Sequence, residues 1–428
     1  MIHVVEHKEP QHSIASEKFH TPQKLYLPLA QATGKPSAPT CQLGQQVQEG
    51  ELIAASDGLI SANLHAPCAG KISAFEQWYH PALKRSSAII IDCCPSPKTY
   101  PCVKSPDALT KEALLSCIQK AGIVGMGGAA FPTHVKLQPP KKIDTLIVNG
   151  CECEPYLATD YRLMVENTEE ILRGVEIVTR IVEPTKVIIA LEDNKPQAIK
   201  NIRRIVSTKK YTLSGAEVVT LKAAYPQGGE KQLIDAVCAR RVPGGKLPFD
   251  VGCLVQNVAT CFAIYEAVFC AKPLIERLVS FAGDALVKPK NIWVKIGTSL
   301  KELFDNKILE FRVAPQKIIS GGPMMGVALD GLEYPILKGT GGFLFLADGV
   351  AAFEETACIR CGRCADACPM RLLPLEYAKR IKRNEFDALH ELYISDCMEC
   401  GSCVYVCPAR IPLVHYIKVG KKYAPAYK

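Results

Sequence analysis

The chain has 428 residues, of which 48% are apolar and 22% charged, and its formal net charge is +8. The apolar fraction excludes an intrinsically disordered protein, and the Gly content and lack of sustained heptads exclude collagen-like and coiled-coil chains. No stretch reaches the roughly 18 uncharged apolar residues of a membrane helix, and the N-terminal segment lacks a signal-peptide core. We therefore expect a multidomain protein exposed to the cytosol.

Residues 1–100 predict an N-terminal β barrel-sandwich domain. Short apolar patches alternate there with Gly and Pro, as in strands joined by tight turns. The segments 47–53 and 65–72 resemble barrel-sandwich domains of the biotinyl/lipoyl type, but Lys71 lacks the Met or Asp neighbours of a carrier lysine, so we interpret it as structural. Upstream histidines predict a solvated arm rather than a metal site: His3, His7, His12 and His20.

Residues 101–272 alternate helix and strand patterns and predict a Rossmann-like α/β domain. We expect a parallel sheet covered on both faces, because parallel strands need crossover helices. Ser105 and Pro106 suit the first turn of a helix that runs to about Lys120, and residues 253–271 predict a buried or amphipathic helix. The other predicted elements are strands at 143–148, 186–191 and 217–221 and helices at 161–182, 197–206 and 230–240.

A glycine-rich loop at 122–136 precedes the predicted strand at 143–148. Gly125, Gly127 and Ala130 fit the spacing of the dinucleotide fingerprint, but a helix precedes the loop where that fingerprint requires a strand. Closely spaced glycines let backbone N–H groups approach a phosphate or a flat ring, and Lys136 would add positive charge. A tight structural turn is the alternative interpretation.

A second candidate loop, residues 149–155, lies at the carboxyl end of the same strand. Open α/β sheets bind ligands at that edge. Glu152 and Glu154 could accept hydrogen bonds from ribose hydroxyls or from a nicotinamide amide. Cys151 and Cys153 suggest a redox pair or metal ligands, but their side chains would alternate in an extended loop, and nothing nearby supplies further ligands.

Cysteine is the strongest chemical signal, because eight of the 20 cysteines form two copies of one pattern within residues 351–428. The spacing C-x2-C-x2-C-x3-C-P is that of bacterial ferredoxins, and in two-cluster proteins the fourth cysteine ligates the other cluster. A reducing compartment argues against a large disulfide framework. We assign one [4Fe-4S] cluster to Cys358, Cys361, Cys364 and Cys407, and the second to Cys397, Cys400, Cys403 and Cys368.

Two zinc sites are the alternative for these cysteines, although zinc usually takes CxxC pairs that are set apart. Apolar residues between the runs recur at helical spacing, so residues 351–428 predict a helical ferredoxin domain with two clusters. Two adjacent clusters conduct electrons and need no acid–base side chain. We therefore predict no catalytic residue in the chain.

The residues also carry a family resemblance. GMGGAAFPTHVK and NGCECEP resemble the FMN- and NADH-binding loops of the flavin subunit of respiratory complex I, and residues 225–233 and 319–326 extend the match. Together with the sandwich domain and the cysteine runs, the order is similar to the C subunit of the Rnf (Rsx) ion-translocating electron-transport complex. The resemblance covers nearly the whole chain and implies a small β-rich, SLBB-like β-grasp module over residues 273–350.

The same resemblance implies FMN and NAD(H) in the α/β domain. The implied cofactor-binding residues are Gly125, Gly127, Gly128, Lys136, Asn149, Glu152, Glu154, Gly228, Gly229 and Glu230. Ala130 and His134 replace glycines that are common in the family, and each would place a side chain near the flavin.

The resemblance further implies a peripheral subunit on the cytoplasmic face of the cell inner membrane. Its partners would be membrane-embedded subunits of the same complex, and ferredoxin or a further iron–sulfur subunit. NADH delivers two electrons as a hydride, whereas a cubane accepts one at a time, and a flavin reconciles the two. The positive charge would balance anionic clusters, so no nucleic-acid partner is expected. The alternatives are a soluble flavin and iron–sulfur diaphorase subunit of a hydrogenase or dehydrogenase, and a flavin-free electron-transfer scaffold.

Overall fold

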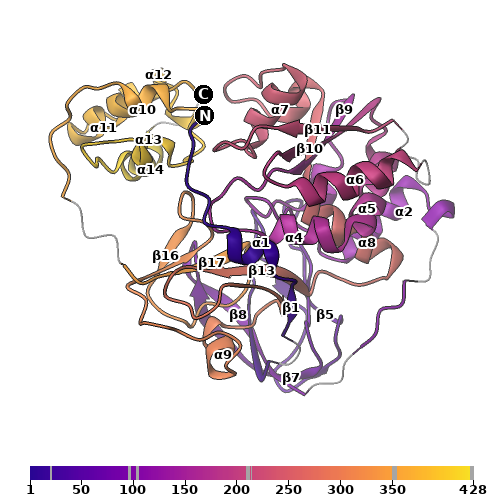
Figure 1. The fold of residues 1–428 in the computed structure, drawn as a ribbon. Helices are drawn as coiled ribbons and strands as arrows, with labels where there is room; N and C mark the ends of the chain where they lie inside the picture. The colour runs from indigo at the N-terminus through magenta and orange to yellow at the C-terminus, as the bar shows by residue number, and fades with distance from the viewer. Residues whose placement is uncertain are drawn as a thin grey trace.

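The computed structural model describes residues 1–19, 22–94, 98–102, 106–208, 213, 215–348 and 354–424. Figure 1 shows a β-rich region at the bottom, an α/β region on the right, and a small helical region at the upper left that contains the cysteine runs. The N-terminus lies beside this helical region (Figure 1). Within the described ranges, no helix combines the length and the apolar character needed to cross a membrane.

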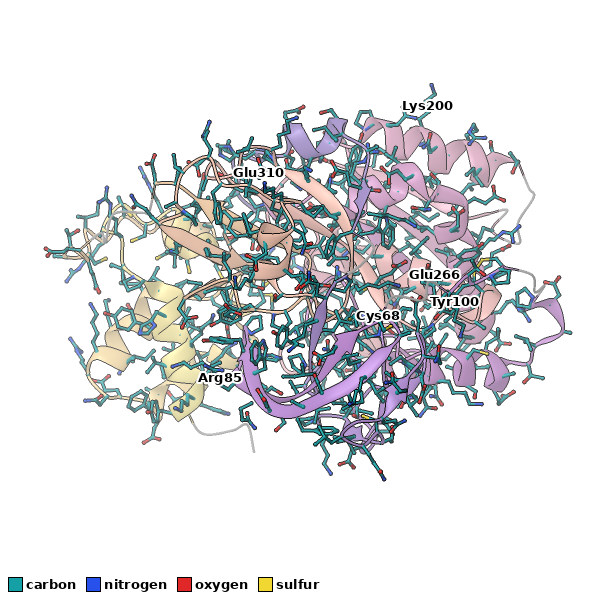
Figure 2. All side chains as sticks on the ribbon, turned by 90° about the horizontal axis from the view of Figure 1, so that it is seen from below. Cys68, Arg85, Tyr100, Lys200, Glu266 and Glu310 are labelled. Atoms are coloured by element: carbon teal, nitrogen blue, oxygen red, sulfur yellow. A yellow bond between two sulfur atoms is a disulfide. The ribbon has the colours of Figure 1, made fainter. Side chains whose placement is uncertain are left out.

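The N-terminal strands form two sheets, of orders β2-β8-β7-β4 and β3-β5-β6. Figure 2 shows the long β7–β8 hairpin from below, with Arg85 toward its tip and Cys68 at its base. Alternate residues such as Leu25 and Leu27 are fully buried, which is the pattern expected of strands with one face in a core. The strands are β2 (Lys24–Pro28), β3 (Ala38–Pro39), β4 (Gln46–Val47), β5 (Leu52–Ala55), β6 (Leu64–His65), β7 (Gly70–His80) and β8 (Lys84–Cys93).

The α/β region is built on a parallel sheet of order β11-β10-β9-β12, as predicted. Leu146 and Val148 face a core that includes α5 and α8, whereas Ile147 faces the α7 side, so helices cover both faces. The strands are β9 (Thr145–Gly150), β10 (Lys186–Glu192), β11 (Glu217–Leu221) and β12 (Cys253–Asn257). The main helices are α2 (Lys111–Lys120), α4 (Thr159–Glu166), α5 (Thr168–Val182), α6 (Pro196–Ser207), α7 (Glu230–Cys238) and α8 (Val258–Phe269).

Three predicted helix boundaries are corrected by the structure. Residues 253–257 form strand β12, and Asn257 caps the helix that follows, so the apolar stretch is a buried strand joined to a buried helix. The predicted helix at 161–182 is broken at Asn167 into α4 and α5. Thr110 caps α2 by accepting a hydrogen bond from the backbone N–H of Ala113 at 3.3 Å, after a short 3-10 turn; Ser105 lies outside the described residues.

The β-rich module has a sheet of order β1-β14-β13-β17-β15-β16. Its first strand comes from the N-terminal arm and pairs in parallel with β14. Phe281, Phe343 and Phe345 are fully buried in its core, under α9 (Leu300–Asp305). The strands are β1 (Glu17–Lys18), β13 (Glu276–Ala282), β14 (Lys290–Lys295), β15 (Lys317–Ser320), β16 (Val327–Leu329) and β17 (Gly342–Leu346).

The N-terminal arm packs on the molecule instead of extending into solvent, which corrects the sequence expectation. The backbone of Ile2 pairs with that of Tyr225 through hydrogen bonds of 2.9 and 2.8 Å. His7 stacks on Tyr156, with ring centroids 4.7 Å apart. The arm includes a short helix, α1 (Glu9–Ser13). His20 lies outside the described residues.

The helical region repeats one backbone pattern at its two cysteine runs. After the second cysteine of each run comes a glycine with positive φ, Gly362 at 77° and Gly401 at 81°, a conformation that costs glycine little. A short helix follows each glycine, and then a longer helix, and these longer helices pack together. The helices are α10 (Arg363–Asp366), α11 (Pro374–Lys382), α12 (Ala388–Glu391), α13 (Ser402–Tyr405) and α14 (Leu413–Tyr423).

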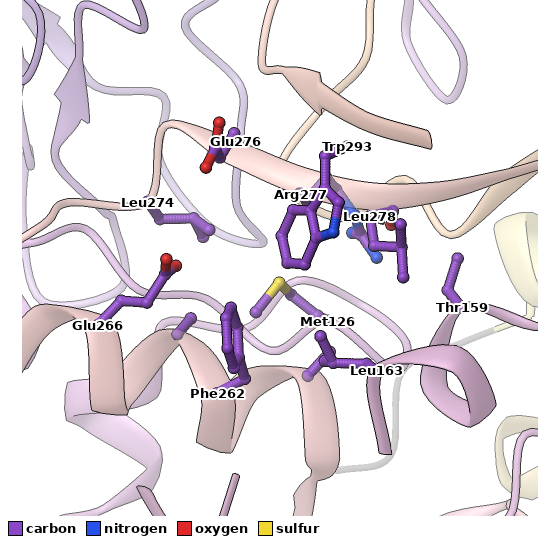
Figure 3. A pocket seen from close by; sticks show the side chains of 12 residues that line it. Met126, Thr159, Leu163, Phe262, Glu266, Leu274, Glu276, Arg277, Leu278 and Trp293 are labelled. Atoms are coloured by element: carbon purple, nitrogen blue, oxygen red, sulfur yellow. Dashed lines mark hydrogen bonds between the residues drawn. The ribbon is translucent and has the colours of Figure 1, made fainter. Parts of the chain in front are cut away.

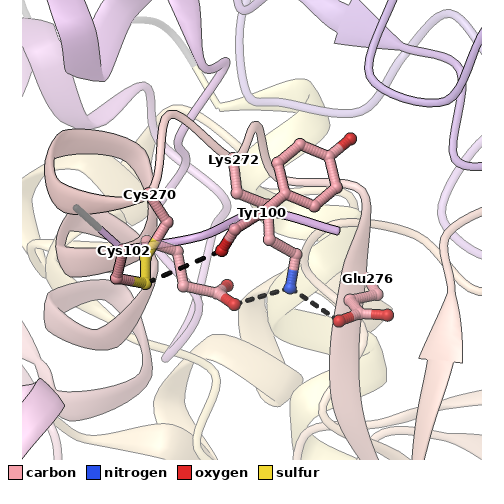
Figure 4. The surroundings of a disulfide bond; sticks show 6 residues. Tyr100, Cys102, Cys270, Lys272 and Glu276 are labelled. Atoms are coloured by element: carbon pink, nitrogen blue, oxygen red, sulfur yellow. Dashed lines mark hydrogen bonds and ion pairs between the residues drawn. A yellow bond between two sulfur atoms is a disulfide. The ribbon is translucent and has the colours of Figure 1, made fainter. Parts of the chain in front are cut away.

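A disulfide that the sequence did not predict joins Cys102 to Cys270, 168 residues apart. It ties the segment before α2 to the end of α8. Beside it, Lys272 Nζ lies 2.5 Å from a carboxylate oxygen of Glu266 and 2.6 Å from one of Glu276 (Figure 4). Burial opposes ionisation of Glu276, but the ammonium groups of Lys272 and Lys295 outweigh it and lower its pKa to about 2.

Candidate functional site

The glycine loop lies over the carboxyl edge of the α/β sheet. It runs from α2 to α3 (Thr133–Lys136) and closes on itself, because the backbone N–H of Gly125 donates to the carbonyl of Phe131 at 2.8 Å. A side chain at Gly127 would come within 2.9 Å of the amide of Asn257, at the end of β12. Gly127 and Gly128 are exposed, and a Cβ at Gly128 would meet nothing within 4 Å. The loop therefore presents bare backbone to an open space.

Met126 anchors the underside of this loop. Its side chain is buried in a small pocket between α8 and the strands β13 and β14, where Figure 3 shows its sulfur between Phe262 and the side chains of Arg277 and Trp293. Its backbone N–H donates to the hydroxyl of Thr260 at 3.0 Å. Met126, between Gly125 and Gly127, thus fixes the loop from behind and leaves the exposed backbone of Gly127 and Gly128 free.

The two positions that depart from the family pattern have different surroundings. Ala130 has a φ of +53°, the left-handed region that favours glycine, which explains why glycine is common there. His134 is buried in α3, and burial lowers its pKa, so its imidazole is neutral at neutral pH. Neither residue inserts a charged group into the loop.

Asn149 joins two of the predicted binding segments. Its side-chain amide donates to the carbonyl of Gly228 at 2.9 Å, and its side-chain oxygen accepts from the backbone N–H of Cys151 at 3.1 Å. Cys151 faces the core beneath α7, whereas Cys153 accepts a hydrogen bond from the N–H of Gly228. The two thiols point to different surroundings and form no pair.

The carboxylates of Glu152 and Glu154, predicted to contact the nucleotide, both accept hydrogen bonds from other residues of this chain. The Glu152 carboxylate accepts hydrogen bonds from the hydroxyl of Thr159 and from the first backbone N–H groups of α4, at 2.8–3.0 Å, and so caps that helix. The Glu154 carboxylate accepts from the backbone N–H groups of Met324 and Met325, at 3.2 and 2.8 Å. Burial raises the pKa of Glu154 to about 7.

A half-exposed ion pair links α3 to α7. Lys136 Nζ lies 2.8 Å from a carboxylate oxygen of Glu230, and the two side chains are 32% and 39% exposed. Glu230 begins α7 directly after Gly228 and Gly229. The structure therefore brings the glycine loop and the Asn149 segment together with the start of α7, which is distant from both in sequence.

Sequence reasoning missed Asn257 and Asp160, which lie at the same edge. The Asn257 side chain donates to Asp160 at 2.7 Å and caps α8. Burial, and then the nearby Glu152, raise the pKa of Asp160 to about 7. An Asn between an apolar strand and a helix is a recognisable cap, but residues 253–271 were interpreted as one helix, which hid it.

Several buried polar atoms at this edge find no hydrogen-bond partner within the described residues: Thr133 Oγ1, Gln227 Nε2 and Gln256 Oε1. Buried polar groups in native proteins are nearly always paired, so such atoms call for a ligand or an ordered water. Bare glycine backbone beside unpaired side-chain donors and acceptors suits a flat, phosphorylated cofactor such as FMN.

Each cysteine run shares a cavity with the fourth cysteine of the other run. We define the inner cavity by Cys368, Cys397, Cys400 and Cys403, and the outer cavity by Cys358, Cys361, Cys364 and Cys407. Among the described residues, no three His, Cys, Asp or Glu side chains converge on a site for a single metal ion. Four thiols that surround a volume fit a cubane better than a zinc ion.

Burial raises the pKa values of three inner thiols, those of Cys368, Cys397 and Cys403. Burial and the neighbouring thiols of Cys397, Cys400 and Cys368 raise the pKa of Cys403 to about 12. A bound metal centre reverses this tendency, because coordination holds a cysteine as the thiolate.

The inner cavity lies against the α/β region. The Tyr225 hydroxyl donates to the carbonyl of Cys400 at 2.7 Å, and the backbone N–H of Gly245 donates to Asp396 at 2.9 Å. Cys400 and Cys403 are only 7% and 6% exposed. The segment that contains Tyr225 continues to Gly228, so it spans from the glycine-loop edge to the inner cavity.

Family models match three stretches of the chain. The RnfC barrel sandwich hybrid domain matches residues 2–94, the Nuo51 FMN-binding domain residues 118–266, and the 4Fe-4S dicluster domain residues 357–411. Among curated proteins, the C subunit of the proton-translocating ferredoxin:NAD(+) oxidoreductase complex of Clostridium ljungdahlii is 45% identical over 82% of this chain and 77% of its own length. The chain belongs to the family of C subunits of these complexes.

Further comparisons agree with this family. The C subunit of the Na(+)-translocating complex of Acetobacterium woodii is 37% identical over 86% of this chain and 83% of its own length. A chain of an NAD+-reducing [NiFe]-hydrogenase shares the fold, with a TM-score of 0.53 and 18% identity over 77% of this chain and 64% of that chain. The predicted sandwich, parallel-sheet and dicluster folds are confirmed, and FMN and [4Fe-4S] clusters are the cofactors of these domains.

Proposed function

We propose that this chain passes electrons between NAD(H), FMN and two [4Fe-4S] clusters, as a subunit of an ion-translocating ferredoxin:NAD+ oxidoreductase complex on the cytoplasmic face of the inner membrane. The observation that carries the proposal is the direct contact between the glycine-loop edge and the inner cavity, through the segment from Tyr225 to Gly228. Electron transfer needs cofactors held close together, and this contact is the short path between them.

The residues proposed to hold FMN are those that meet at the sheet edge. When bound, FMN accepts a hydride and passes electrons on singly. The backbone of Gly125, Gly127 and Gly128 would lie against it, and Lys136 would add positive charge near its phosphate or the nucleotide. The remaining residues are Asn149, Asn257, Gly228, Gly229 and Glu230.

For Glu152 and Glu154 we propose an indirect role. Both carboxylates hydrogen-bond backbone groups of this chain, so they fix α4 and the 322–326 loop around the site. These hydrogen bonds orient the binding segments and exclude water from the side of the segments that faces away from the cofactor. Orientation and control of the surroundings are what a protein contributes to the chemistry of a cofactor.

The route out of the chain is proposed to end at the outer cavity. Cys358 and Cys361 are exposed, and so are Arg360 and Arg363 beside them, while Ile359 is 68% exposed. Arg360 and Arg363 thus form a basic rim around the apolar side chain of Ile359. Such a surface suits an acidic redox partner, such as a ferredoxin or an iron–sulfur subunit, better than a nucleic acid. Membrane-embedded subunits of the complex would hold the chain at the membrane.

A cofactor inventory tests the proposal. The anaerobically purified chain should contain about eight iron and eight sulfide per chain, should bind FMN, and should reduce ferricyanide with NADH. Iron without flavin and without NADH-dependent activity would favour an electron-transfer scaffold. Zinc in place of iron would contradict the proposal. Retention of the complex's other subunits in purified membranes would separate it from a soluble diaphorase subunit.

A further inference from the structure

Lys338 lies between β16 and β17 and is completely buried. Its ammonium nitrogen lies 2.5 Å from the backbone carbonyl oxygen of Asn63 and 2.7 Å from that of Gly122. Asn63 belongs to the barrel sandwich, and Gly122 is the first residue of the glycine loop. One side chain of the β-rich module therefore joins both other regions at the point where the loop begins.

This lysine has no carboxylate partner among the described residues. Its pKa is lowered to about 7 by burial alone, with no opposing charge. The neighbouring His65 is also buried; burial, and then Lys338, lower its pKa to about 3, so it is neutral at neutral pH and adds no second positive charge. Burying a lysine in this way is unfavourable, and its two carbonyl contacts are the interactions that offset the cost.

The backbone of Lys338 is fixed on both sides. Its N–H donates to the side-chain oxygen of Gln31 at 2.9 Å, and its carbonyl accepts from the guanidinium of Arg277 at 2.5 Å. Gln31 belongs to the barrel sandwich and Arg277 to β13. These two contacts fix the backbone of Lys338, from which the side chain extends to the start of the loop.

The far end of the glycine loop is held by the same two regions. The backbone N–H of Thr33 donates to the carbonyl of Ala130 at 3.2 Å, and its hydroxyl donates to the carbonyl of Ala129. A Cβ on Gly339, next to Lys338, would lie 3.2 Å from the Ala130 side chain. The barrel sandwich and the β-rich module therefore contact the loop at its entry and at its exit.

We propose that Lys338 is a positioning residue for the glycine loop, and that through it the barrel sandwich clamps this loop on the sheet edge. The glycines have no side chains that could hold the loop, so its shape depends on buried neighbours such as Val124 and Met126 and on contacts at its two ends. The consequence for FMN rests on the proposed function. A loop held in its binding shape loses less conformational entropy when the cofactor binds.

The test compares Lys338→Met with Lys295→Met in the full chain. Lys295 also joins the barrel sandwich to the β-rich module, at 3.2 Å from Glu49, and its ion-pair partners Glu49 and Glu276 both lie outside the loop. Amide hydrogen exchange of residues 123–131 and FMN affinity, measured by flavin fluorescence, are the readouts. Lys338→Met should accelerate exchange and weaken FMN each by about tenfold, and Lys295→Met should change neither.

Thr33→Val is a milder second variant, because Thr33 is exposed and the chain should fold without its hydroxyl. Thr33→Val should also accelerate exchange and weaken FMN binding, each by less than tenfold. If Lys338→Met does not fold, Thr33→Val still tests whether the barrel sandwich clamps the loop. Unchanged exchange in both variants, or equal effects of Lys295→Met and Lys338→Met, would overturn the clamp. A native chain that binds no FMN would refute the proposed site, while hydrogen exchange would still test the clamp.

Discussion

The two cysteine runs have the same spacing and the same backbone pattern but different surroundings. Cys400 is 7% exposed beneath the α/β region, whereas its counterpart Cys361 is exposed to solvent. Arg360 and Glu399 occupy matching positions, with the same φ of 57°, and carry opposite charges. The same ligand spacing therefore occurs in two settings: the second run is buried at an internal contact, and the first run lies at a basic outer surface. Ligand identity follows from local spacing, but the order of the clusters follows from tertiary packing.

The largest expected effect comes from removing the fourth ligand of each cavity. Cys407→Ser should remove the outer cluster and Cys368→Ser the inner one, because each lines the cavity of the opposite run. Each variant should lose about half of its iron. Paramagnetic resonance of the reduced proteins checks which signal disappears. Loss of the inner signal in Cys407→Ser would contradict the exchanged ligands.

The basic rim gives the next largest effect. Reversing both charges, Arg360→Glu with Arg363→Glu, should slow electron exchange with an acidic ferredoxin by about tenfold at low salt, and less at high salt. Lys200→Glu is the control: it is exposed on α6, at the opposite end of the molecule from the helical region (Figure 2). Stopped-flow kinetics against ionic strength measures both. Equal slowing by Lys200→Glu would show that Arg360 and Arg363 are not the binding surface for the ferredoxin.

A smaller effect is expected at the inner contact. Tyr225→Phe removes the hydroxyl that donates to the Cys400 carbonyl at 2.7 Å, which should destabilise docking of the helical region by about 1 kcal/mol. Cluster content should stay unchanged. Amide hydrogen exchange of residues 394–405 reports the docking, and full native protection in the variant would show that the bond contributes nothing.

The last effect is confined to a range of pH and comes from Glu154, which holds the 322–326 loop next to Gly401 of the inner run. Burial raises its folded pKa to about 7 above an ordinary value of 4.5, so its stabilising contribution is present at low pH and is lost as the pH rises through 7. Glu154→Gln should therefore gain stability relative to the native chain between pH 5 and 8, by about 1–3 kcal/mol.

Thermal unfolding at several pH values measures the Glu154 effect, with the exposed Glu310→Gln as control. The control should parallel the native chain across the whole range. A native and a Glu154→Gln curve that stay parallel would mean that the carboxyl ionises normally.

The sequence predicted what local spacing determines and missed what distant contacts determine. The pattern of the eight cysteines is one of intervals of a few residues, and the parallel sheet follows from alternating patterns. The assignment of four cysteines to each cluster stays a prediction, with which the lining of the two cavities agrees. The directions of the Glu152 and Glu154 carboxylates do not follow from local patterns. Glu152 has a φ of +44° and its carboxylate contacts α4, whereas that of Glu154 contacts the distant 322–326 loop. The Cys102–Cys270 bond and the contacts of Lys338 join segments that no local pattern relates.

The central claim is that the inner cluster lies in series between the flavin and the outer cluster. The most direct measurement is NADH reduction of Cys400→Ser, loaded with FMN and shown by iron content to keep one cluster. With the series order, the outer cluster should stay oxidised with NADH but should be reduced by dithionite. Reduction of that cluster by NADH at the native rate would contradict the account.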